Sequence, residues 1–214
     1  MLLGKNSKLV MIGDSITDCG RNRPIGEGYS GALGNGYVSL VDALLGSVYF
    51  HHGIRVVNVG SSGETVRDLR RRWQSDVVDL KPNWVSIMIG INDVWRQFDS
   101  PTRPEAHVYL DEYEATLNDL VTETKRSSGV ILMTPFYIEP NREDPMRQQM
   151  DRYGDTVKRL ALQHDVTLVD TQAAFDEVLD HYYAATLAGD RVHPTLTGHM
   201  VIARALLNAL GFLW

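Results

Sequence analysis

The sequence predicts an α/β fold of the doubly wound kind, a three-layer sandwich in which helices cover both faces of a five-stranded parallel sheet. Two observations lead to this prediction. Short apolar runs such as Leu9–Ile12 and Val130–Met133 are continuous rather than alternating, which is typical of strands buried on both faces. Segments with helical spacing of apolar residues lie between these runs. Regular alternation of strand and helix along one chain indicates a parallel sheet between two helical layers.

Five short segments are expected to form the strands. They are Leu9–Ile12, Val56–Val59, Val85–Ile89, Val130–Met133 and Val166–Val169. All are rich in apolar residues, and Val and Ile are favoured in strands because their branched side chains pack well on a pleated surface.

Six longer segments are expected to form helices. They are Tyr37–Tyr49, Thr65–Leu80, Tyr109–Lys125, Met146–His164, Gln172–Tyr183 and Thr195–Leu210. In the second of these, Leu69, Trp73 and Val77 recur every four residues, which places them on one face of a helix.

Composition predicts one globular domain over residues 1–214, because 43% of the residues are hydrophobic, 22% are charged and no linker or repeat divides the chain. A formal net charge of −6 argues against nucleic acid as a partner, since phosphate binding needs a basic face. No apolar run approaches the ~18 residues of a membrane span. The single cysteine, Cys19, and the lack of a signal-peptide pattern lead us to expect a cytoplasmic protein that does not contact membranes.

Two short polar motifs stand near opposite ends of the chain. GDSITD at residues 13–18 follows the first apolar run, and DRVHP at residues 190–194 precedes the last helical segment. A serine hydroxyl becomes a good nucleophile when a histidine takes its proton and a carboxylate orients that histidine. Asp190 and His193 stand three positions apart, which one turn brings close together. Ser15 is therefore the candidate nucleophile, with His193 as base and Asp190 as the orienting acid.

Two further motifs offer hydrogen-bond donors after other predicted strands. NVGSSG at residues 58–63 follows the second run, and GIND at residues 90–93 follows the third. The negative oxygen that develops in acyl transfer is stabilised by backbone N–H groups and amide side chains. Gly63 permits close approach of the backbone, and Asn92 offers an amide. Ligands of parallel sheets bind beyond the carboxyl ends of the strands, so we expect both residues near Ser15.

Two aspartates border these motifs. Asp14 and Asp93 are expected to accept hydrogen bonds from loop amides and so to support Ser15 and Asn92. A glycosidase would need two carboxyl groups about 5–10 Å apart, and Asp14 with Asp190 formally meets that requirement. That alternative leaves the serine, histidine and asparagine motifs unexplained.

The four motifs together resemble the sequence blocks of the SGNH hydrolases, the GDSL esterase family, and they span nearly the whole chain. The resemblance implies the flavodoxin-like SGNH-hydrolase fold and acyl transfer to water through an acyl-enzyme. It implies that Ser15, His193 and Asp190 form the triad. It also implies that the Ser15 N–H, the Gly63 N–H and the Asn92 side-chain amide form the oxyanion hole.

No metal ion or cofactor is expected. The other histidines form no His-Glu-x-x-His motif; they are His51, His52, His107, His164, His181 and His199. The glycine-rich segment Gly20–Gly36 lacks a P-loop and a dinucleotide-binding fingerprint, which favours a mobile loop beside the site.

Aromatic side chains beside polar ones suggest a sugar as the substrate. Trp95 follows the third motif and Tyr137 follows the fourth predicted strand, and aromatic faces stack on sugar rings. Both are therefore candidate substrate-binding residues. The alternative that these rings are core or subunit contacts stays open.

Longer segments, among them NVGSSGETVRDL, WVSIMIGINDVWRQ and DTQAAF, are similar to the intracellular acetylxylan esterases of the SGNH family. That resemblance implies removal of acetyl groups from short xylo-oligosaccharides and a homo-oligomeric protein. Gly189 departs from relatives that carry a bulky aromatic residue there, which alters the local pocket. A broad-specificity carboxylesterase, a lysophospholipase, a thioesterase and a non-hydrolytic carbohydrate-binding module remain as alternatives.

Overall fold

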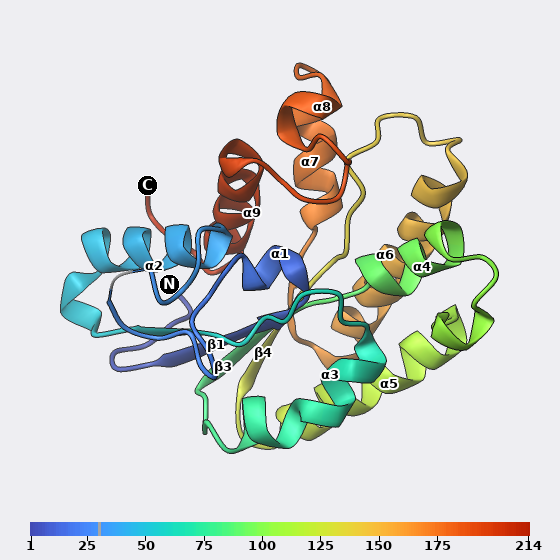
Figure 1. The fold of residues 1–214 in the computed structure, drawn as a ribbon. Helices are drawn as coiled ribbons and strands as arrows, with labels where there is room; N and C mark the ends of the chain where they lie inside the picture. The colour runs from blue at the N-terminus through green and yellow to red at the C-terminus, as the bar shows by residue number, and fades with distance from the viewer. Residues whose placement is uncertain (30) are drawn as a thin grey trace.

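The chain folds around one parallel sheet, as the sequence predicts (Figure 1). The computed structural model describes residues 1–29 and 31–214; Ser30, in the expected Gly20–Gly36 loop, lies outside the described residues. The strands are β1 (Lys8–Gly13), β2 (Arg55–Asn58), β3 (Trp84–Met88), β4 (Gly129–Met133) and β5 (Thr167–Val169). Each observed boundary lies within one residue of the predicted one.

The order of the strands is β2-β1-β3-β4-β5, and all neighbouring pairs are parallel. The strand β1 is therefore central: Leu9 pairs with Val56 of β2 on one side and with Trp84 of β3 on the other. The chain first leaves β1 for β2 and later returns to the opposite side of β1. Such a switch in strand order brings the loops after β1, β2 and β3 together at one edge, where doubly wound folds bind ligands.

Helices cover both faces of the sheet (Figure 1). On one face α2 (Tyr37–Val48) packs against α9 (Leu196–Ala209), and α7 (Thr171–Leu179) also contacts α9. On the other face α5 (Leu110–Thr124) lies between α3 (Val66–Trp73) and α6 (Pro145–His164). The short helices α1 (Ser15–Asp18), α4 (Ile91–Asp99) and α8 (Ala184–Leu187) lie in the loops beyond the strands.

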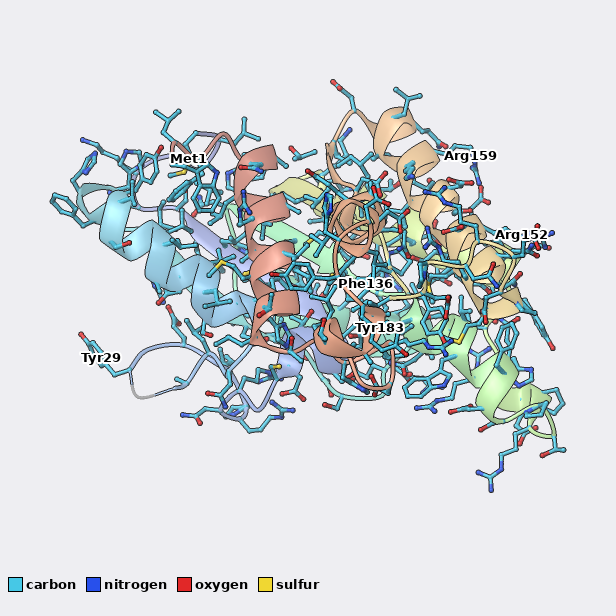
Figure 2. All side chains as sticks on the ribbon, turned by 90° about the horizontal axis from the view of Figure 1, so that it is seen from above. Met1, Tyr29, Phe136, Arg152, Arg159 and Tyr183 are labelled. Atoms are coloured by element: carbon cyan, nitrogen blue, oxygen red, sulfur yellow. The ribbon has the colours of Figure 1, made fainter. Side chains whose placement is uncertain are left out.

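The hydrophobic core fills the space between the sheet and the two helical layers. Leu9, Val10 and Met11 of β1 are fully buried, as a central strand covered on both faces requires. Seen from above, Phe136 lies in the middle of the molecule, whereas Tyr29 projects at its edge (Figure 2). None of the helices in the described part of the chain has the length and apolar character of a membrane span.

Some helix boundaries differ from the expected ones. The helix expected over Thr65–Leu80 ends as α3 at Trp73 and continues as a π-helical turn over Gln74–Val78, in which the Asp79 N–H bonds to the Gln74 carbonyl. The helix expected over Gln172–Tyr183 ends at Leu179, and α8 follows separately. The sequence does not predict the helices α1 and α4, because α1 has four residues and both begin inside polar motifs.

Candidate active site

Ser15 stands at the first position of α1, directly beyond the carboxyl end of β1. Asp14 precedes this helix as its N-cap, and its Oδ1 accepts a hydrogen bond from the Ile16 N–H at 3.0 Å. A carboxylate at this position satisfies an N–H group that the first helical turn leaves free. The cap therefore fixes the short helix on which the Ser15 hydroxyl is presented.

The two ends of the chain meet at this hydroxyl. Ser15 Oγ lies 2.9 Å from His193 Nε2, and His193 Nδ1 lies 2.6 Å from Asp190 Oδ2. The other Asp190 oxygen accepts hydrogen bonds from the Val192 N–H and the His193 N–H, which closes the turn from Asp190 to His193. The structure thus brings together the three residues predicted from motifs 178 positions apart.

The ionisation state of Asp190 determines which ring nitrogen of His193 carries the proton. Burial raises the pKa of its carboxyl group, but hydrogen bonds from the His193 side chain and from backbone N–H groups outweigh burial and hold the pKa below its ordinary value. The ionised Asp190 accepts a hydrogen bond from the Nδ1–H group of His193, which keeps the imidazole proton on Nδ1. The Nε2 atom then carries the lone pair, and the Ser15 hydroxyl donates to it.

Gly63 and Asn92 follow the two strands that flank β1. Gly63 has φ +82°, a backbone conformation that favours glycine, and a Cβ atom there would meet no atom within 4 Å. Asn92 is buried, and its Nδ2 donates to the Glu64 carbonyl at 2.9 Å. That bond uses one of the two amide N–H groups and leaves the other for a ligand. Gly63, in the loop after β2, and Asn92, in the first turn of α4 after β3, therefore follow the two strands that flank the strand of Ser15.

We expect Asn92→Ala to lower kcat by about 10²–10³-fold with little change in KM, the effect of removing one oxyanion donor. The amide stabilises charge that is present in the transition state and absent in the bound ester. Steady-state hydrolysis of p-nitrophenyl acetate measures both constants. A change confined to KM would make Asn92 a substrate-binding residue instead.

The two bordering aspartates are fully buried. Asp93 Oδ1 accepts a hydrogen bond from the Val66 N–H at 3.0 Å, so this residue anchors the start of α3 rather than the backbone of Asn92. Burial raises the pKa of Asp14 to about 7 and that of Asp93 to about 8, although backbone hydrogen bonds oppose the effect. The Asp93 Oδ2 atom has no hydrogen-bond partner among the described residues, as suits a neutral carboxyl group.

The raised pKa of Asp93 predicts a pH-dependent contribution to stability. Between its unfolded value of 3.8 and its folded value of about 8, the folded chain holds a proton that the unfolded chain has released. Stability therefore falls as pH rises through this range. Asp93→Asn keeps the acceptor for Val66 and removes the titration. We expect the melting temperature of the variant to rise relative to that of the wild type from about pH 5 to pH 8, and Asp119→Asn, at an exposed position of α5, is the control. A constant difference between Asp93→Asn and wild type would contradict this prediction.

The two predicted substrate-binding aromatics occupy different environments. Trp95 of α4 is partly buried, and its ring packs edge-on against the His193 ring at 5.9 Å between centroids. Tyr137 is 9% exposed and belongs to the hydrophobic core, so its ring face is not open to a sugar. The expectation of a stacking role for Tyr137 is therefore corrected. The sequence shows that an aromatic follows β4 but not which way its ring points.

Arg72 is a residue of this site that the sequence does not reveal. Its guanidinium donates to the carbonyls of Gly13 and Val59 and to the Glu64 carboxylate, so that α3 holds the loops after β1 and β2. Arg70 and Arg71 stand beside it in the sequence and form surface ion pairs instead. Only the three-dimensional structure separates Arg72 from its neighbours.

A cysteine and a histidine lie beside the triad and form a separate pair. The Tyr37 N–H donates to Nδ1 of His199, so the His199 proton is on Nε2, which lies 3.2 Å from Cys19 Sγ. Burial lowers the pKa of His199 to about 4 and raises that of the Cys19 thiol. His199 is thus a neutral donor and does not activate the thiol as a nucleophile. Among the described residues, no group of three or more His, Cys, Asp or Glu side chains is arranged to hold a metal ion.

Comparison with known proteins identifies the family. The model of the GDSL-like lipase/acylhydrolase family matches residues 11–201, a range that contains every motif discussed above. The chain therefore belongs to the GDSL-like lipase/acylhydrolase family. The resemblance to SGNH hydrolases inferred from the motifs is confirmed.

Close relatives are known within this family. An acetylxylan esterase of Geobacillus stearothermophilus is 63% identical over 215 residues, covering 100% of this chain and 98% of the relative. The crystal structure of that enzyme matches with a TM-score of 0.99, over 100% of this chain and 98% of the other. An α/β hydrolase from the metagenome of Lake Arreo, Spain, is 55% identical, with a TM-score of 0.98 and coverage of 100% and 99%. Variants of the Geobacillus esterase with a serine, a histidine or an aspartate replaced are described as catalytic mutants.

Proposed function

We propose that this protein is a serine esterase that removes O-acetyl groups from acetylated xylo-oligosaccharides or related sugars. The observation that carries the proposal is the hydrogen-bonded series from Ser15 through His193 to Asp190. The 63% identity to an acetylxylan esterase over the full chain supports the substrate class.

The reaction follows from the geometry of the site. His193 Nε2 takes the proton as Ser15 Oγ attacks the acetyl carbonyl, and ionised Asp190 stabilises the resulting imidazolium. The carbonyl oxygen becomes negative and accepts hydrogen bonds from the N–H groups of Ser15 and Gly63 and from the Asn92 amide. The bond from the acetyl carbon to the sugar oxygen then breaks, and His193 donates its proton to that oxygen, which leaves as a hydroxyl. Water, activated by the same histidine, attacks the acetyl-enzyme and releases acetate.

An open site suits a bulky alcohol with a small acyl group. The side chains of His193 and Asp190 are 47% and 45% exposed, so a sugar reaches the triad without entering a deep cavity. Trp95, packed against His193, offers an apolar edge beside the reacting bond. Long acyl chains need a sizeable apolar cleft to be bound well, and a half-exposed triad does not provide that burial.

We expect acetyl esters to be preferred over butyryl and octanoyl esters. Each added methylene changes discrimination by only about 1–3 kcal/mol in a pocket, so propionyl esters still react appreciably. The test measures kcat/KM for p-nitrophenyl esters of rising chain length and acetate release from acetylated xylose. A rate that rises with chain length, with no acetate released from the sugar, would assign the chain to the lipases or thioesterases.

A carbohydrate-binding module without hydrolysis is the alternative of another class. It does not explain why a histidine held by an aspartate lies within 2.9 Å of a serine hydroxyl. Hydrolysis of p-nitrophenyl acetate separates the two, because a binding module leaves the ester intact.

We further infer a single domain, a cytoplasmic location and a homo-oligomer. A single cysteine that forms no internal disulfide suits a reducing compartment. Exposed apolar side chains near the C-terminus support self-association, among them Phe50, Leu213 and Trp214.

A further inference from the structure

The loop that carries Gly63 is packed directly against the helix that carries Ser15. Figure 1 shows the segment between β2 and α3 running alongside α1. A Cβ atom on Gly60 would lie 2.3 Å from the Asp18 backbone nitrogen, so only glycine fits at this contact. The Ser61 N–H donates to the Gly13 carbonyl at 3.0 Å. The loop and the helix therefore touch through their backbones.

The carboxylate of Asp18 adds a side-chain contact to this loop, at the residue before Gly63. Asp18 is the last residue of α1, three positions after Ser15, and its side chain is 5% exposed. Its Oδ2 accepts hydrogen bonds from the Ser62 N–H at 3.0 Å and from the Ser62 hydroxyl at 2.9 Å. Arg23 binds the same carboxylate in a bidentate manner: its Nη1 donates to Oδ1 and its Nη2 donates to Oδ2.

Asp18 remains an acceptor at neutral pH. Burial raises the pKa of its carboxyl group, but hydrogen bonds from Arg23 and Ser62 outweigh burial and hold the pKa below its ordinary value. An anionic acceptor makes stronger hydrogen bonds than a neutral one, and Asp18 accepts two of them from one residue of the loop.

Gly63 is held from both sides while its own N–H stays free. Asp18 holds Ser62 before it, and the Asn92 amide donates to the Glu64 carbonyl after it. No acceptor takes the Gly63 N–H among the described residues. Holding both neighbours of Gly63 restricts the directions in which its N–H can point and leaves that N–H free for a ligand. A misplacement of 1 Å in a catalytic group can cost about 10²-fold in rate.

We propose that Asp18 is a positioning residue of the esterase: it holds the Gly63 N–H in place relative to Ser15 by binding Ser62 from the helix of the nucleophile. This inference rests on the oxyanion hole of the proposed function. Asp18 touches neither the substrate nor the reacting atoms and acts only through Ser62.

The experiment compares Asp18→Ala and Asp18→Asn with a matched control. Glu114 is also bound in a bidentate manner by an arginine, Arg159, but on the outer helices α5 and α6, so Glu114→Ala and Glu114→Gln control for loss of such an ion pair. We expect Asp18→Ala to lower kcat by about 10–100-fold with KM nearly unchanged. Asp18→Asn should lose less, because its amide oxygen still accepts from the Ser62 N–H. Both Glu114 variants should retain wild-type kcat.

A second readout reports on the oxyanion hole itself. A trifluoromethyl ketone adds reversibly to the nucleophilic serine and places an oxyanion in the hole. We expect the Ki of this inhibitor to rise in Asp18→Ala by about the factor by which kcat falls. A loss of stability alone would leave the Ki of the folded fraction at the wild-type value.

The inference is overturned if folded Asp18→Ala matches Glu114→Ala in kcat and Ki. If Asp18→Ala fails to fold, the test uses Asp18→Asn and Ser62→Ala instead. A wild-type kcat in both of these variants would overturn the inference. Failure of the proposed function is a different result, because the wild-type protein itself would then release no acetate.

Discussion

Ser15→Ala should abolish ester hydrolysis while the protein stays folded. The hydroxyl is the only atom of the triad that forms a bond with the acyl group, and replacing a catalytic serine typically costs about 10⁴–10⁶-fold in kcat. Ser15 is partly exposed at the start of a four-residue helix, and among the described residues its side chain bonds to His193 alone, so the fold loses little. The residual rate comes from binding and oxyanion stabilisation.

The measurement is kcat for p-nitrophenyl acetate together with a thermal melt. Ser47→Ala is a suitable control, because Ser47 is an exposed residue of α2 whose hydroxyl donates to the Leu44 carbonyl within the same helix. A folded Ser15→Ala protein that hydrolyses the ester at a near-normal rate would exclude Ser15 as the nucleophile.

His193→Ala should be comparably severe. Without the imidazole, the serine keeps its proton and the departing alcohol receives none, so both chemical steps slow down. The loss in kcat should again reach several orders of magnitude, because the members of a triad act as one unit and their effects do not add. The double variant Ser15→Ala/His193→Ala should therefore be scarcely slower than either single variant.

His51→Ala provides the control, since His51 is exposed in the turn between α2 and the start of β2, whereas Ser15 lies beyond the carboxyl end of β1. Adding imidazole to the His193→Ala protein should recover part of the activity, because a free base then enters the vacated space. Additive losses in the double variant would contradict the assignment of His193 as the base of Ser15.

Much of the fold is predictable because its causes are local. A strand covered on both faces needs a continuous apolar run, and β1 and β4 lie where such runs stand in the sequence. The triad is predictable for a similar reason. The turn from Asp190 to His193 closes through bonds within four residues, and the GDS motif combines a cap with a nucleophile.

The remaining features depend on contacts between distant residues. Arg72 reaches the carbonyl of Gly13, 59 positions away, and nothing in the spacing of three consecutive arginines indicates which one does so. Tyr137 resembles a sugar-binding residue in the sequence, yet the packing of neighbouring elements buries its ring. Which arginine reaches Gly13 and whether the Tyr137 ring is buried depend on packing between residues far apart in the sequence. Local periodicity therefore does not predict either feature.

The site joins residues from the two ends of the chain, and this has a consequence for biosynthesis. Ser15 emerges early from the ribosome. His193, whose hydrogen bond activates the Ser15 hydroxyl, is synthesised 178 positions later. The nascent chain therefore cannot hydrolyse esters while the sheet and its covering helices are still assembling. Esterase activity during translation or refolding therefore reports that the loop carrying His193 has reached Ser15, with the helix that follows this loop, α9, packed against α2.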